Sequence, residues 1–89
     1  MIYNVADLKN KQVVGMETGT VLGFIGELEI DITTGSVANI VIFGKQKLYG
    51  VLGREEDIQI PWSNISVIGE ETVLVKGPVV FKNSKRKSL

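Results

Sequence analysis

Three carboxylates stand two residues apart in the segment ELEID, at Glu27, Glu29 and Asp31. In a β-strand, side chains at this spacing point to one face at intervals of about 6.5 to 7 Å. Such a row could bind a hard cation such as Ca²⁺ if a neighbouring strand added oxygen ligands. The same pattern is typical of a strand face that contacts solvent, and this interpretation is favoured over a cation site. We therefore predict no metal site, and keep cation binding as an alternative.

A second acidic run, Glu55, Glu56 and Asp57, follows Arg54. Adjacent residues of a strand point to opposite faces, so these carboxylates are not expected to pair as a general acid and base. We interpret them as charged residues at the start of a strand.

The segment 44–53, GKQKLYGVLG, is rich in glycine. It does not form a phosphate-binding loop, because the spacing G-x-x-x-x-G-K is missing and Gly44 and Lys45 are not followed by Ser or Thr. We predict an exposed loop instead. Apolar side chains exposed among charged ones often mark a binding surface, and the candidate contact residues here are Lys47, Leu48, Tyr49, Val51 and Arg54.

Histidine and cysteine are both absent from the chain. This excludes catalysis by histidine, thiolate nucleophiles and most zinc sites. Ser84 and Ser88 stand near Lys85 and Lys87, but in a segment without the regular pattern needed to hold a nucleophile and its base in place. We predict that the protein is not an enzyme and holds no cofactor.

Strands are predicted from residue 12 onward by β-branched residues, alternation and glycine. In the segment 27–32, alternation predicts that Leu28, Ile30 and Ile32 face a core. The segment 33–36 is predicted to be a turn in which Gly35 has a positive φ. The apolar segment 37–43 then returns as a strand covered on both faces, in the middle of the fold.

The rest of the chain continues this pattern. Pro61 is predicted at a strand end or edge, because proline cannot donate to a sheet, and Trp62 is predicted to fill the core. The segments 65–68 and 72–76 are expected to form a hairpin. Only the segment 5–8 is predicted to be helical, with Asn4 as its cap.

These elements predict an all-β fold, a small single-domain β-barrel of about six short strands with at most one or two short helical turns. The 89 residues allow one domain, and a hydrophobic content of 44% supplies its core. We place the domain at residues 1–76 and a C-terminal arm at 77–89. The apolar part of the arm, 78–81, is expected to dock on its own barrel or on a second copy, which makes Val80 and Phe81 further candidate contact residues.

The zero net charge hides an asymmetry. Residues 1–81 hold six basic and ten acidic residues, a net charge of −4, whereas Lys82, Lys85, Arg86 and Lys87 give the tail +4. Such a tail can contact RNA or an acidic protein, or keep the chain end solvated, and the last interpretation is favoured.

Neither an export signal nor a membrane helix is expected. The first ten residues include Asp7 and two asparagines, and the longest apolar run elsewhere is the segment 40–43. These features lack the apolar stretch that either element needs. We predict a cytoplasmic protein without membrane insertion.

Several of these segments carry a resemblance to a known family. LGFIGELEID (22–31), the turn at Thr34 and Gly35, the apolar strand after it, and IQIPWSNISVIGEETVLV (58–75) resemble the PRC-barrel family. Within it, the chain is most similar to the small stand-alone bacterial members associated with sporulation. The resemblance covers about residues 5–76. It implies a small β-barrel that contacts other proteins or ribonucleoprotein, with no catalytic residue to carry over.

The sequence therefore leaves three alternative functions open. The first is a non-enzymatic adaptor, or protein-interaction barrel, that binds an unidentified protein partner or a second copy; the resemblance implies that it acts in sporulation. The second is a ribonucleoprotein or RNA-processing accessory factor, with RNA contact through the basic tail. The third is a small-ligand or cation-binding barrel.

Overall fold

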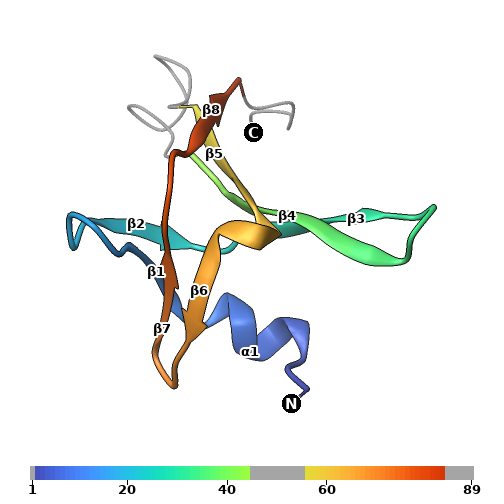
Figure 1. Cartoon of the computed structure of the whole chain (residues 1–89), viewed down its shortest axis with the longest axis horizontal. Helices are drawn as coiled ribbons and strands as arrows, with labels where there is room; N and C mark the ends of the chain where they lie inside the picture. Colours follow the sequence, from blue (N-terminus) through green and yellow to red (C-terminus); the bar gives the residue numbers. More distant parts are fainter. Residues whose placement is uncertain (1, 45–55, 84–89) are drawn as a thin grey trace, which may run out of the picture.

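The computed structural model describes residues 2–44 and 56–83, and these form eight strands, one α-helix and one 3₁₀ helix (Figure 1). The prediction of a small all-β domain is confirmed. The elements are α1 (Val5–Lys9), β1 (Gln12–Gly15), β2 (Val21–Phe24), β3 (Glu27–Asp31), β4 (Ser36–Ile42), β5 (Asp57–Pro61), η2 (Trp62–Asn64), β6 (Ile65–Ile68), β7 (Thr72–Val75) and β8 (Val80–Lys82).

One sheet has the strand order β2-β1-β7-β6. Its two inner strands, β1 and β7, run parallel, with Gln12 opposite Thr72 and Gly15 opposite Val75. The pairs β1–β2 and β6–β7 are antiparallel. The predicted hairpin of 65–68 and 72–76 is thus present. It is joined to the rest of the sheet by the pairing of β7 with β1, a strand that lies near the start of the chain.

The second sheet has the strand order β3-β4-β5-β8, and all its pairs are antiparallel. The apolar strand β4 lies between β3 and β5, as predicted. At the turn between β3 and β4, Gly35 has a φ of +75°, which also agrees with the prediction. Pro61 is the last residue of β5, where a missing N–H does least harm to a sheet.

The core lies between the two sheets and is made mainly of β-branched side chains. Ile40 and Ile60 from one sheet and Val13 and Val73 from the other are fully buried. The helix α1 adds Leu8 to the same cluster. Its first turn is capped as predicted, since the Asn4 side chain accepts a hydrogen bond of 2.8 Å from the Asp7 N–H.

The alternation in the segment 27–32 predicted three buried apolar side chains, and only the first of them is confirmed. Leu28 packs against the core, but Ile30 is 58% exposed and Ile32 is 92% exposed. The β3–β4 hairpin extends away from the rest of the molecule (Figure 1), and its register shifts between Glu29 and Ile30. Residues beyond that shift therefore have no opposite sheet to cover them, and the predicted core role of these two isoleucines is wrong.

The described residues form eight strands, where about six were expected. Strand β8 comes from the predicted apolar arm and pairs antiparallel with β5. The apolar arm was expected to dock on its own barrel or on a second copy. In the structure, residues 80–82 pair with their own domain.

Lys11 is a buried cation that the sequence did not single out. It is 8% exposed, and its Nζ donates a hydrogen bond of 2.6 Å to the Glu70 carbonyl. The same Nζ lies 5.7 Å from the centre of the Tyr3 ring, and the Tyr3 hydroxyl donates to the Ile68 carbonyl at 3.4 Å. Together these contacts join the N-terminal segment to the β6–β7 hairpin.

Replacing Lys11 by methionine should lower the free energy of unfolding by about 1 to 2 kcal/mol, because the apolar stem is kept while the charged hydrogen bond is lost. Urea denaturation measures this change. The exposed neighbour Lys9 is the control, and Lys9→Met should change stability by no more than about 0.5 kcal/mol. Equal stability of the two variants would show that the bond to Glu70 has no net effect.

Candidate partner-binding surface

Strand β8 forms one edge of its sheet. Its antiparallel pairing with β5 places Val80 opposite Gln59, Phe81 opposite Ile58 and Lys82 opposite Asp57. Within residues 2–44 and 56–83, no strand pairs with its other side. An edge of this kind presents backbone N–H and C=O groups to which another chain can pair.

The two apolar side chains of β8 stay exposed although the strand is paired. Val80 is 46% exposed and Phe81 is 59% exposed. As neighbours in a strand they point to opposite faces of the sheet. Phe81 shares the core-side face with Ile58, whereas Val80 shares the other face with Gln59. The two predicted contact residues therefore lie on either side of one edge, and do not form a single patch.

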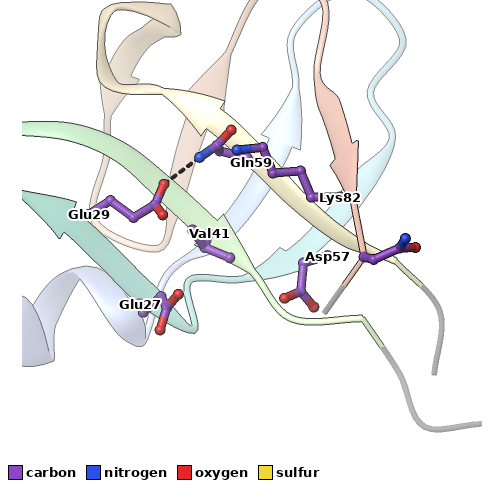
Figure 2. A pocket seen from close by; sticks show the side chains of 7 residues that line it. Glu27, Glu29, Val41, Asp57, Gln59 and Lys82 are labelled. Carbon is purple, nitrogen blue, oxygen red and sulfur yellow. Dashed lines mark hydrogen bonds between the residues drawn. The ribbon is translucent and has the colours of Figure 1, made fainter. Parts of the chain in front are cut away.

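A hollow of about 270 Å³ lies on the face that Val80 shares (Figure 2). The side chains that line it come from all four strands of the sheet and the residue after β8: Glu27, Glu29, Val41, Asp57, Gln59, Lys82 and Asn83. Among the described residues, its lining includes three carboxylates and one ammonium group. The acidic pattern of β3 and the acidic start of β5, far apart in the sequence, are brought together here.

Hydrogen bonds fix two of the carboxylates. Glu29 Oε1 accepts bonds from the side-chain amides of Asn39, at 3.1 Å, and of Gln59 (Figure 2). Asp57 is only 8% exposed, and its Oδ1 accepts a bond of 2.7 Å from the Gly44 N–H. Hydrogen bonds of this kind offset the cost of removing carboxylates from water.

The three carboxylates of the first sequence pattern do not act as one set. Glu27 and Glu29 line the hollow, whereas Asp31 turns to its own loop and accepts a bond of 2.9 Å from the Thr33 N–H. In the described part of the chain, no three acidic side chains are grouped so that they could hold a metal ion.

The predicted contact residues of the glycine-rich loop, Lys47, Leu48, Tyr49, Val51 and Arg54, lie outside the described residues. Sequence reasoning missed Gln59 and Lys82 as residues of the hollow. The sequence did offer a signal for Asn39, because it is the one polar residue of the apolar segment 37–43. The structure places it directly opposite Glu29.

No helix among the described residues is long and apolar enough to cross a membrane.

Comparison with known proteins identifies the family. The model of the PRC-barrel domain matches residues 1–81. The chain is 40% identical over 75 residues to the probable sporulation protein YlmC of Bacillus subtilis (strain 168), covering 84% of this chain and 93% of the relative. It is 35% identical over 81 residues to an uncharacterised protein of Clostridium acetobutylicum, covering 91% and 92%.

A third relative is the uncharacterised protein YmxH of Bacillus subtilis (strain 168), with 28% identity over 75 residues, 82% of this chain and 87% of the relative. None of the three names describes an enzyme. The match over residues 1–81 and the 40% identity confirm the resemblance seen in the sequence. The chain belongs to the PRC-barrel family.

Proposed function

We propose that the protein is a non-enzymatic adaptor that binds a protein partner through the surface around β8. The observation that carries this proposal is an edge strand with exposed apolar side chains, Val80 at 46% and Phe81 at 59%. Soluble proteins usually protect sheet edges with charges, bulges or covering segments. An edge with apolar side chains on both of its faces is suited to contact with another chain.

The process in which such an adaptor acts is proposed from the relatives. The name of YlmC places that protein, as a probable assignment, in sporulation. We extend the assignment to this chain, and expect its partner to be present in sporulating cells.

The test compares variants of two valines with matched exposure. Val80 on β8 is 46% exposed, and Val67, on the edge strand β6 of the other sheet, is 49% exposed. Tagged wild-type protein, Val80→Ser, Phe81→Ser and Val67→Ser are used to isolate partners from a lysate of sporulating cells, with and without nuclease treatment. Recovered proteins are quantified by mass spectrometry. Circular dichroism verifies that each variant is folded.

We expect Phe81→Ser to reduce recovery of a defined partner at least about tenfold, since loss of an apolar anchor at an interface typically exceeds 1.4 kcal/mol. Val80→Ser should reduce it less, and Val67→Ser should leave it unchanged. Equal recovery with all four proteins would refute the placement at β8. Loss of every partner on nuclease treatment would instead favour the ribonucleoprotein alternative.

A further inference from the structure

The sheet β2-β1-β7-β6 carries an unbroken apolar row on its outer face, the face turned away from the core. One residue from each strand forms the row, and each lies opposite the next: Val21, Val14, Leu74 and Val67. Val13 and Val73, the neighbours of the two central members, are fully buried, so alternation turns the row outward. Its ends are open, since Val21 is 55% exposed and Val67 is 49% exposed.

The same face is uncharged. None of the residues of β1, β2, β6 and β7 carries a charge, although charged residues make up 22% of the chain. Phe24, which lies opposite Gln12 on this face, adds a further apolar side chain and is 52% exposed. The outer face of such a sheet usually meets water with polar side chains, whereas the centre of a protein interface is poor in charges.

The charges that border this face differ in sign at its two ends. Glu70 and Glu71 come directly before β7, and Lys76 comes directly after it. All three side chains are exposed. If the outer faces of two copies meet with their β7 strands antiparallel, the acidic end of each copy lies against Lys76 of the other. With parallel strands, like charges would meet, and like charges across an interface are unfavourable.

We propose that this face binds a second copy of the chain in the antiparallel arrangement. The twofold axis lies along the apolar row, so each residue of the row meets its own counterpart as the two sheets pack face to face. A four-stranded face with strands of four residues has a flat area of about 250 Å². Stable complexes bury about 800 Å² per partner, so we expect a weak dimer with a dissociation constant in the micromolar to millimolar range.

Sedimentation equilibrium of the full chain, from about 10 μM to about 1 mM, measures the dimer. Val21→Lys and Val67→Lys each place a charge at one end of the row, against the same charge of the second copy. We expect each to weaken the dimer at least about tenfold. Val5 on α1 is 52% exposed, so Val5→Lys is the matched control and should leave the dimer unchanged. Circular dichroism verifies that each variant is folded.

Reversal of the bordering charges tests the antiparallel arrangement. Lys76→Glu and Glu71→Lys each replace attraction at the two ends by repulsion, and each should weaken the dimer at least about threefold at low salt. The double variant exchanges the two charges and should recover most of the lost affinity. Single variants without effect, or a double variant as weak as the single ones, would overturn this arrangement.

The other outcomes are equally decisive. One monomer mass at every concentration would overturn a second copy as the occupant, and equal weakening by Val5→Lys would show that any added charge has the same effect. A dimer lost in Val80→Lys but kept in Val67→Lys would move the contact to β8 and overturn this surface. The adaptor proposal is tested separately, because Val67 lies on the other sheet: Val67→Lys should weaken the dimer and leave recovery of the cellular partner unchanged.

Discussion

Replacing Ile60 by alanine should lower the free energy of unfolding by about 2 to 5 kcal/mol. Ile60 is fully buried and lies directly opposite Ile40, which is also fully buried. The substitution removes apolar contacts and leaves a cavity that the facing sheet fills only in part. Because a domain of this size has a total stability of roughly 5 to 15 kcal/mol, the effect is a large fraction of the whole. Urea denaturation followed by Trp62 fluorescence measures it.

The exposed isoleucine at the hairpin tip provides the control. Ile32 is 92% exposed, so Ile32→Ala should change stability by no more than about 0.5 kcal/mol. Should Ile60→Ala fail to fold, Ile60→Val gives a milder test, with an expected loss of about 0.5 to 1.5 kcal/mol. If the variants at 60 and 32 lose the same stability, the described core is incorrect.

The second large effect is expected at Gly23, where alanine should lower the free energy of unfolding by about 2 to 4 kcal/mol. Gly23 has a φ of +133°, a backbone conformation that side chains of L-residues rarely adopt, and an added Cβ would lie 3.0 Å from Cγ2 of Ile42. Ile42 is itself only 4% exposed. Backbone strain and overpacking therefore act together, and thermal or urea denaturation measures their sum.

A second glycine separates these two causes. Gly19 has a φ of +69°, but an added Cβ there would have no atom within 4 Å. Gly19→Ala should therefore show the backbone cost alone, about 1 kcal/mol. Removing Cγ2 of the neighbour should recover part of the packing cost, so Ile42→Ala should be less harmful in the Gly23→Ala background than in the wild type. Additive losses would rule out the steric contact.

The local features of the fold could be predicted from the sequence because neighbouring residues determine them. The turn at Gly35 and the end of β5 at Pro61 follow from the backbone conformations that these residue types allow. The cap at Asn4 follows from the ability of its side chain to accept a backbone hydrogen bond. The central place of β4 followed from its apolar residues on both faces. These preferences depend on residues that are close together in the sequence, so they can be recognised in a single sequence.

Features that depend on distant residues were missed. Nothing near β1 indicates that it pairs in parallel with β7, and nothing near Lys11 indicates that its ammonium group reaches the Glu70 carbonyl. The exposure of Ile30 and Ile32 likewise depends on where the facing sheet ends. Alternation predicts which side chains share a face of a strand, but it does not predict how far that face is covered.

The candidate surface could be predicted only in part. The apolar run that includes Val80 and Phe81 stood out in the sequence, yet their separation to opposite faces required knowledge that residues 80–82 form a strand. Asp57 was expected at a strand start and does begin β5. Its burial and its bond to the Gly44 N–H result from the pairing of β4 with β5, which no local pattern specifies.

The parallel pair at the centre of the first sheet also bears on how the protein is made. A ribosome releases residues 12–15 long before residues 72–75, their partner strand. The nascent chain therefore carries β1 without a neighbour on that side until nearly all of the domain has been synthesised, and high contact order of this kind slows folding. Fragments that end before residue 72 cannot complete this sheet, so translation products cut short there should be substrates for chaperones and proteases.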